Sequence, residues 1–270
     1  MGTERRRGTV STSLESALEK LRVQGYIVLR DVLSSDACAD LAGRIDAALR
    51  RELDQFGEAR LRELREFGQV RSPCAFDPVF LSLLLHPHVM PYIEATIEKT
   101  AILHLQNAIV TFPDDVHWQS RFHRDFAKHF VADRPLSMNA FFLIDDFDAT
   151  TGATWFVPQT HQNAVMPSES YLEEHAVQIE APRGSVVIFD SMLVHRAGTN
   201  RSNAPRRAVN HQYTRPFVKQ QMDLAHMMRG RVDPESRLAQ VLGLWSVPPK
   251  SLEEFRVVDP PRRTYRAGQG

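Results

Sequence analysis

The sequence predicts a mostly β protein whose core of strands is flanked by helices at both ends. Short apolar runs fill the middle of the chain, between residues 101 and 216, and clusters of Asp, Gly, Pro and Asn separate them. Several short strands at this spacing are typical of a sandwich or barrel. Apolar residues at helical spacing precede this region, and helix signals return after Phe217. No flexible linker or internal repeat divides the 270 residues, so we expect a single domain over 1–270.

Residues 13–100 are expected to hold the first helices and the first strand, after a disordered tail over 1–12. Thr12 and Glu15 fit a capping box, which predicts the start of a helix that Gly25 ends. An apolar run at 26–29 then predicts a strand.

A second helix is expected to begin at Ser34 or Ser35, because serine is a favoured cap. Its inner face would carry Cys38, Leu41, Ala42, Ile45 and Leu49. The charged stretch 50–67 is expected to be an exposed helix, and 89–96 another short one.

Six strands are predicted in the central region, 101–216, from apolar runs bounded by turn residues. They cover residues 101–112, 136–144, 154–157, 176–180, 185–189 and 206–214. The tail, 217–270, is expected to be helical. Asp233-Pro234-Glu235 would form a cap and first turn there, and Leu238, Val241 and Leu242 would pack the helix onto the core.

Composition argues against several classes of protein. Formal net charge is zero, with 33 basic and 33 acidic residues, whereas a nucleic-acid-binding protein usually carries a basic excess or stripe. Cys38 and Cys74 lack a CxxC partner, which disfavours a zinc ribbon or a redox motif. No apolar run reaches about 18 residues, and the start of the chain has no apolar signal core. We therefore expect a cytoplasmic protein that binds neither nucleic acid nor membrane; its oligomeric state carries no sequence signal.

The pattern with the most chemistry is His123 and Asp125, followed 72 positions later (195 − 123) by His195. Residues two apart on a strand point to the same face, so the first pair could reach one metal ion. His195 follows the predicted strand 185–189, which a barrel could bring alongside. Two imidazoles and one carboxylate leave open positions on an octahedral ion, which suits non-haem Fe(II). A His-X-Asp pair alone is a chance pattern in many chains, and this chain has 11 histidines.

An arginine at the eleventh position after His195 strengthens the metal-site interpretation. Arg206 presents a permanently charged, planar set of donors that fits a carboxylate-bearing co-substrate such as 2-oxoglutarate. Arg207 is adjacent and would point to the opposite face of the same strand, so one of the two is expected to be a surface charge.

Five segments together resemble the phytanoyl-CoA dioxygenase family of Fe(II)/2-oxoglutarate-dependent oxygenases, over about 18–255. The segments are 25–33, 122–126, 151–158, 184–190 and 195–200. The resemblance implies a double-stranded β-helix, or jelly-roll, of the cupin-like kind. It also implies that His123, Asp125 and His195 are the catalytic iron ligands.

The same resemblance implies roles for three further residues. Arg206 would pair with the distal carboxylate of 2-oxoglutarate, Thr154 would donate to that carboxylate, and Gln106 would contact the co-substrate. For Thr154 and Gln106, an interior polar residue satisfied by a neighbour is the alternative. The sequence departs from the family at Pro158-Gln159-Thr160-His161, where members carry Pro-Gly-Ser-His, and this affects the expected shape of one turn.

The reaction implied by the resemblance consumes O2 and 2-oxoglutarate and releases succinate and CO2. We expect hydroxylation of a small molecule, as in natural-product tailoring, and Asp125 disfavours halogenation because halogenating relatives lack that carboxylate. Phe126, His129 and Trp118 lie near the first motif and are candidates for the substrate pocket, against a packing role. The stretch 50–67 and the tail after Phe217 are candidates for a lid.

Two other functions stay open at this point. One is a metal-dependent barrel enzyme that does not use 2-oxoglutarate and employs zinc or iron as a Lewis acid. The other is a non-catalytic binding protein on the same scaffold. Arg206 discriminates against the first, which has no need for a buried guanidinium, and the intact set of ligands argues against the second.

Overall fold

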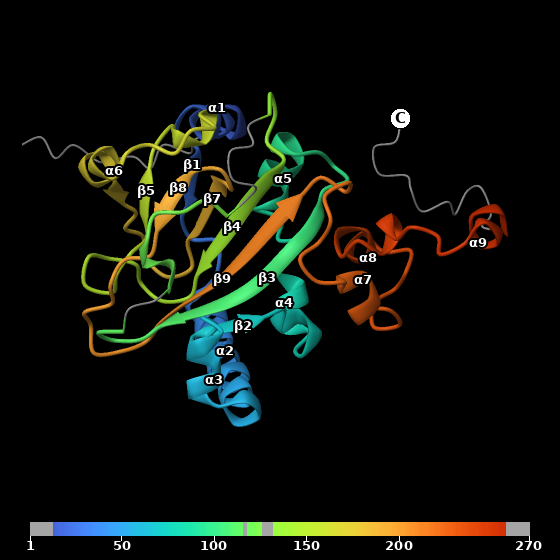
Figure 1. The fold of residues 1–270 in the computed structure, drawn as a ribbon, viewed down its shortest axis with the longest axis horizontal. Helices are drawn as coiled ribbons and strands as arrows, with labels where there is room; N and C mark the ends of the chain where they lie inside the picture. The colour runs from blue at the N-terminus through green and yellow to red at the C-terminus, as the bar shows by residue number, and fades with distance from the viewer. Residues whose placement is uncertain (1–12, 116–117, 126–131, 258–270) are drawn as a thin grey trace, which may run out of the picture.

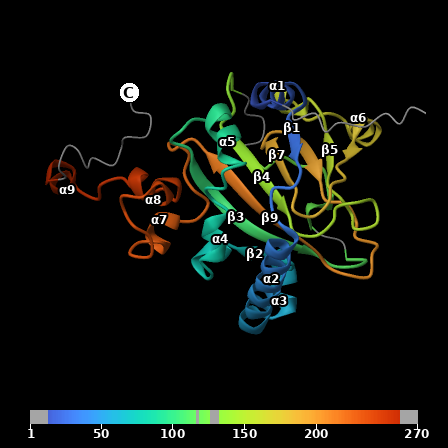
Figure 2. The same cartoon turned by 180° about the vertical axis from the view of Figure 1, so that it is seen from behind.

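The computed structural model describes residues 13–115, 118–125 and 132–257, and its core is two antiparallel sheets (Figures 1 and 2). The larger sheet has six strands in the order β1-β7-β4-β9-β3-β2, and the smaller has three in the order β6-β5-β8. The strands are β1 (Tyr26–Leu29), β2 (Gln69–Arg71), β3 (Ile102–Thr111), β4 (Ser137–Leu143), β5 (Trp155–Val157), β6 (Val177–Gln178), β7 (Val186–Asp190), β8 (Val194–Arg196) and β9 (Arg206–Thr214).

The two sheets pack against each other through one apolar layer, which confirms the expected jelly-roll. Strand β9 lies at the centre of the larger sheet, paired with β3 from Arg206 to Thr214 and with β4 from Ala208 to Thr214. Side chains alternate along each strand, so one face of the larger sheet turns toward the smaller sheet. The layer between the sheets consists of Ile109, Phe141, Leu143, Phe147, Ala153, Phe156, Ile179, Ala181, Val187, Phe189, Leu193 and Ala208.

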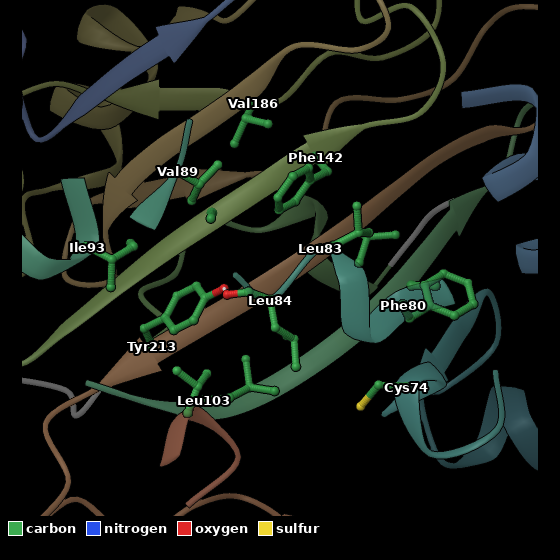
Figure 3. Packing of buried hydrophobic residues seen from close by; sticks show 14 of the residues in the cluster. Cys74, Phe80, Leu83, Leu84, Val89, Ile93, Leu103, Phe142, Val186 and Tyr213 are labelled. Atoms are coloured by element: carbon green, nitrogen blue, oxygen red, sulfur yellow. The ribbon is translucent and has the colours of Figure 1, made fainter. Parts of the chain in front are cut away.

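Helices cover the other face of the larger sheet, where the main hydrophobic core lies (Figure 2). Figure 3 shows part of this core, with Tyr213 pointing toward Leu84, whose carbonyl accepts a 2.9 Å hydrogen bond from the tyrosine hydroxyl. The α-helices are α1 (Leu14–Gln24), α2 (Ser35–Phe56), α3 (Glu58–Glu63), α4 (Val79–Ser82), α5 (Met90–Thr96), α6 (Glu169–His175), α7 (Leu224–Met227), α8 (Arg237–Val241) and α9 (Leu252–Val257). Short 3-10 turns are η1 (Pro73–Ala75), η2 (Trp118–Ser120), η3 (Thr160–Gln162) and η4 (Leu244–Ser246).

The ends of the helices test the predicted caps. Ser34 caps α2, as expected, with its hydroxyl accepting from Ala37 N at 3.2 Å. Gly25 ends α1 in the left-handed conformation, at φ 89°. The cap of α1 is Ser13 and not Thr12, which lies outside the described residues. The prediction for α8 was also wrong: its cap is Ser236, whose backbone N–H bonds to the carbonyl of Asp233, so the Asp-Pro-Glu segment is a turn before the helix.

The tail after Phe217 packs away from the layer between the sheets. Gln220 Nε2 donates to the carbonyls of Leu103 at 2.6 Å and Leu242 at 3.1 Å, and Gln240 Nε2 donates to Thr100 O at 2.7 Å. Val241 and Leu242 are buried in the main core, as predicted. Because α7 and α8 lie beside one end of the larger sheet, on its outer face, they form no lid over the inner layer (Figure 1). Among the described residues, no helix is long and apolar enough to span a membrane.

Candidate metal centre

His123 and His195 lie side by side although 72 positions (195 − 123) separate them. His123 forms an isolated antiparallel bridge with His195 of β8, in which each backbone N–H donates to the other's carbonyl, at 2.9 and 3.0 Å. Their ring centroids are 4.4 Å apart. A single bridge therefore holds the His123–Asp125 motif to the edge of the smaller sheet. The motif was expected to lie on a strand, but it is not part of a regular one.

The ring orientations of both histidines are set in the same way. His123 Nδ1 bonds to the carbonyl of Arg121 at 2.8 Å, and His195 Nδ1 bonds to the carbonyl of Leu193 at 2.9 Å. A carbonyl only accepts, so each Nδ1 carries a proton, and in the neutral imidazole each Nε2 keeps a free lone pair. Both Nε2 atoms face one oxygen of Asp125, with Oδ1 3.4 Å from His123 and 3.5 Å from His195.

The three side chains fit a divalent metal ion. One ligand atom from each of His123, Asp125 and His195 lies within 4.8 Å of the others. His123 Nε2 is buried and has no hydrogen-bond partner among the described residues, a costly arrangement that a bound metal ion would relieve. The three residues therefore come together in the structure, as the sequence predicted.

The charges of the three groups are coupled. Burial alone would lower the pKa of His123, but the nearby Asp125 carboxylate raises it overall. Burial alone would raise the pKa of Asp125, but the neighbouring His195 and His123 lower it well below its usual range. The site therefore favours an ionised carboxylate, and that carboxylate favours a proton on His123 with which a metal ion would compete.

Asn139 of β4 contacts the metal-facing carboxylate, and sequence reasoning missed it. Its amide Nδ2 donates to Asp125 Oδ2. Its own Oδ1 accepts from the hydroxyl of Ser191 at 3.0 Å, and the amide of Asp125 donates to the carbonyl of Ser191 at 3.0 Å. Asn139 lies in an apolar strand with no motif around it, so only its place in the folded sheet identifies it.

Arg206 lies in the same cavity, at the start of β9. Its side chain is 3% exposed, sits over the ring of Phe147 at 4.1 Å and donates to the carbonyl of Gly152. The backbone of Gly152 packs closely against that of Thr199. A Cβ at position 152 would lie 2.5 Å from the Thr199 carbonyl carbon, so this position needs a glycine. Arg206 Nε has no partner and no carboxylate forms an ion pair with the guanidinium, both within the described parts of the chain.

The charge state of Arg206 makes it a site for an anion. Burial lowers the pKa of its guanidinium to about 9, which leaves it charged at neutral pH. A buried cation without an anionic partner is unfavourable, and a carboxylate ligand would supply that partner. Arg207 points to the other face, where it pairs with Asp46 at 2.7 Å and Asp145 at 2.9 Å. Arg207 is thus held on the other face by two ion pairs, and Arg206 is the arginine that lines the cavity.

The cavity itself is small, about 40 Å³, and lies between the metal-facing trio and Arg206. Thr154 is one of its walls, and its role as a donor to the co-substrate stays a prediction. Asn210 of β9 is another, with its buried Oδ1 unpartnered among the described side chains. The full lining is Ile109, Thr111, Gln119, His123, Asp125, Phe141, Thr154, Phe189, His195, Ala197, Arg206 and Asn210.

Gln106 does not belong to this site, contrary to the prediction. Strand β3 turns its side chain to the opposite face of the larger sheet, where it is fully buried. Its Oε1 accepts from Cys74 N at 2.8 Å, and its Nε2 donates to Phe80 O at 3.0 Å and to His211 Nε2 at 2.8 Å. The prediction failed because side chains alternate along β3. The odd-numbered residues Ile109 and Thr111 face the cavity, so the even-numbered Gln106 faces the other side of the sheet.

The three candidate substrate residues have different outcomes. Phe126 and His129 lie outside the described residues. Trp118 is 42% exposed, and its ring centroid is 6.4 Å from that of His123, so it borders the metal-facing trio. Next to it, α3 is tied to the loop before η2 by Arg62 and Asp115, 3.1 Å apart, so part of the stretch 50–67 borders this side of the molecule.

The fold and the trio define a jelly-roll protein with a candidate mononuclear metal centre. The chain belongs to the phytanoyl-CoA dioxygenase family, whose model, Phytanoyl-CoA dioxygenase (PhyH), matches residues 21–208. It is 37% identical over 268 residues to "Uncharacterized protein Rv1501" of Mycobacterium tuberculosis and to "Uncharacterized protein Mb1539" of Mycobacterium bovis, with 96% of this chain and 97% of each relative covered.

Solved structures of the same fold include a 2-oxoglutarate complex and an α-ketoglutarate-dependent epimerase. EctD from S. alaskensis, solved with 2-oxoglutarate and 5-hydroxyectoine, is 19% identical with a TM-score of 0.62, over 78% of this chain and 79% of that one. The α-ketoglutarate-dependent epimerase SnoN from nogalamycin biosynthesis is 18% identical with a TM-score of 0.56, over 74% and 80%. At these identities the likeness shows the shared fold.

Proposed function

We propose that this protein is an Fe(II)/2-oxoglutarate-dependent dioxygenase that oxidises a small organic molecule, with hydroxylation as the default outcome. One observation carries the proposal. The His123–Asp125–His195 trio and a buried Arg206, which forms no ion pair with any described carboxylate, line the same small cavity. A two-histidine, one-carboxylate set is the ligand set of non-haem Fe(II) oxygenases, and the guanidinium supplies the partner that a second carboxylate needs.

The roles of the residues follow from their positions. His123 Nε2, His195 Nε2 and Asp125 Oδ1 would hold the metal ion. Arg206 would bind the distal carboxylate of 2-oxoglutarate, and the Thr154 hydroxyl would donate to the same carboxylate. The chemistry that bound iron and 2-oxoglutarate supply is O2 activation coupled to release of succinate and CO2.

The apolar walls of the cavity would orient the co-substrate and exclude water. Ile109, Phe141 and Phe189 form an apolar surface against which the co-substrate's carbon chain would pack. Exclusion of water strengthens the attraction between Arg206 and a carboxylate, since the effective dielectric constant falls. Family membership supports the assignment, as do the ligands of two proteins of the same fold: SnoN was solved with Fe3+ and α-ketoglutarate, and EctD with 2-oxoglutarate.

A separate cavity of about 680 Å³, which shares no lining residue with the metal-facing cavity, is our candidate for the substrate chamber. Its described lining is mostly apolar and includes Leu21 of α1, Ile97 and Met138. Ser137 lines it too, and Asp190 and Met192, which also line it, flank the Ser191 carbonyl that accepts from the Asp125 amide. Volume and lining suit a small molecule with an apolar body.

The experiment that tests the proposal is a substrate screen that measures O2-dependent release of succinate from 2-oxoglutarate. The iron-loaded protein should release succinate slowly alone and faster with a productive substrate. Stimulation should disappear in an Arg206→Ala variant assayed at the same 2-oxoglutarate concentration. Succinate release that is independent of Fe(II) would contradict the proposal.

A further inference from the structure

We propose that Asn139 is a positioning residue that restricts Asp125 to a single metal-binding oxygen. The inference rests on the proposed metal centre and goes beyond it, since it concerns how many positions on the ion stay open. It follows from the different surroundings of the two oxygens of Asp125.

The two carboxylate oxygens of Asp125 have different surroundings. Oδ1 is the oxygen that faces both histidines, at 3.4 Å from His123 Nε2 and 3.5 Å from His195 Nε2. Oδ2 accepts a hydrogen bond from Asn139 Nδ2. Hydrogen bonds from outer residues orient the ligands of metal sites in this way.

Asn139 cannot turn its amide round, because a chain of donors fixes it. Gln212 Nε2 donates to Ser137 Oγ at 2.9 Å, Ser137 and Ser191 share a hydrogen bond of 2.8 Å, and Ser191 Oγ donates to Asn139 Oδ1 at 3.0 Å. One assignment of protons satisfies the whole chain: Gln212 to Ser137, Ser137 to Ser191, Ser191 to Asn139, and Asn139 to Asp125. The direction of donation therefore ends at the carboxylate.

Burial makes this assignment strict. Asn139 and Ser191 are fully buried, and Ser137 and Gln212 are 2% and 1% exposed. A flipped Asn139 would place its carbonyl oxygen against the carboxylate, which loses the buried hydrogen bond to Asp125, and would force the Ser191 hydroxyl to reverse its donation. Asn139 is also directly opposite Gln212 in the β4–β9 register, so the sheet itself aligns the two ends of the chain.

A single metal-binding oxygen on Asp125 determines how many coordination positions on the ion stay open. Two imidazoles and one carboxylate oxygen leave three positions on a six-coordinate ion. A co-substrate that bound the ion through two atoms would use two of these positions, and one would remain. A carboxylate that used both oxygens would take that third position, so a donor held against Oδ2 preserves it.

The test uses Co(II)-loaded protein, whose visible absorption reports the coordination of the ion, with affinity measured by competition against a chelator. Asn139→Leu keeps the approximate shape and removes the donor. We expect Co(II) binding to weaken by about 10- to 100-fold, the usual effect of losing such an outer partner. We also expect the absorption bands of the fully loaded variant to change in position or intensity.

Asn107→Leu is the matched control. Asn107 is a buried asparagine of the same sheet, 5% exposed, and contacts Arg71 and Gln69 at 3.0 Å in the amide orientation that satisfies both of its atoms. It does not line the metal-facing cavity. This variant should lose thermal stability but bind Co(II) with the affinity and spectrum of the unsubstituted protein.

Three outcomes separate the proposals. Wild-type affinity and spectrum in folded Asn139→Leu protein would overturn the role of Asn139. Should that variant fail to fold, Asn139→Val takes its place, because it also removes the donor to Asp125 Oδ2 and suits a β-strand; unchanged Co(II) affinity and spectrum would then overturn the inference. Failure of the unsubstituted protein to bind Co(II) or Fe(II) would instead contradict the proposed function.

Discussion

Each backbone N–H of His123 and His195 donates to the carbonyl of the other, and this pair of hydrogen bonds joins the two halves of the metal-facing trio. The bridge brings the imidazoles to a centroid separation of 4.4 Å. Because backbone bonds and Nδ1 bonds both hold the rings, the site is organised by the fold and its ligands need little rearrangement on binding.

Removing one ligand should therefore abolish metal binding without unfolding the protein. We expect His123→Ala and Asp125→Ala to weaken Co(II) binding by more than about 100-fold, beyond the effect of losing an outer partner, and to eliminate metal-dependent succinate formation. His175→Ala is the control, since His175 is an exposed residue stacked on Tyr171. Retained turnover in either ligand variant would mean that the ligands are assigned wrongly.

Arg206→Ala and Arg207→Ala should have opposite phenotypes. The first removes the buried guanidinium that faces the cavity, and the loss of a charge-assisted carboxylate partner should raise the Kd for 2-oxoglutarate by about 100-fold. The second breaks ion pairs with Asp46 and Asp145 on the far face, so it should lower Tm and leave that Kd within about threefold. Isothermal titration with metal-loaded protein measures both; the reverse pattern would place the wrong arginine in the cavity.

Metal affinity should rise with pH through the neutral range. Since Asp125 raises the pKa of His123, this imidazole holds its proton at pH values where an ordinary histidine has lost it, and a metal ion must displace that proton. In metal-free protein the stability gained from the protonated His123 is present at low pH and is lost as pH rises through the raised pKa. The increase in Tm on adding Co(II) should thus grow between about pH 6 and pH 8. An increment that shrinks over this interval would contradict the coupling.

Gln106→Leu should damage stability and not co-substrate binding. The change leaves the Cys74 N–H buried without its acceptor and removes a donor from Phe80 O, which should cost about 1–3 kcal/mol of unfolding free energy. The Kd for 2-oxoglutarate should be unchanged, whereas Thr154→Val should raise it, because Thr154 lines the cavity. Chemical denaturation and titration together check both effects. A raised Kd in the Gln106 variant would restore a role that the strand's geometry denies it.

Much of this architecture was predictable from local pattern. The strand predicted at 26–29 is β1, and the six predicted in the central region correspond to β3, β4, β5, β6, β7 and β9, because alternating apolar residues and turn clusters are local signals. The strands β2 and β8, three residues each, were missed since so short a run carries little periodicity. His195 lies on β8, so its approach to His123 could be inferred from the chemistry of the motif but not from a predicted strand.

Roles that depend on strand phase or on long-range contacts were not predictable. Gln106 was assigned to the wrong face because a bulge between Leu103 and Leu105 and the alternation beyond it decide which side chains turn inward. Asn139 lies in an apolar strand, and its importance arises from Asp125 and Ser191, which come from other segments. Arg206, in contrast, was distinguished from Arg207 through its spacing from His195, and the ion pairs of Arg207 agree with that choice.

The central claim is that one ion held by His123, Asp125 and His195 shares its cavity with 2-oxoglutarate held by Arg206. The most direct measurement is the visible absorption of the anaerobic protein after addition of Fe(II) and then 2-oxoglutarate. A weak charge-transfer band should develop with 2-oxoglutarate in the unsubstituted protein, require much higher concentrations in Arg206→Ala, and be absent in Asp125→Ala. Iron-loaded, folded protein that shows no band at saturating 2-oxoglutarate would contradict the account.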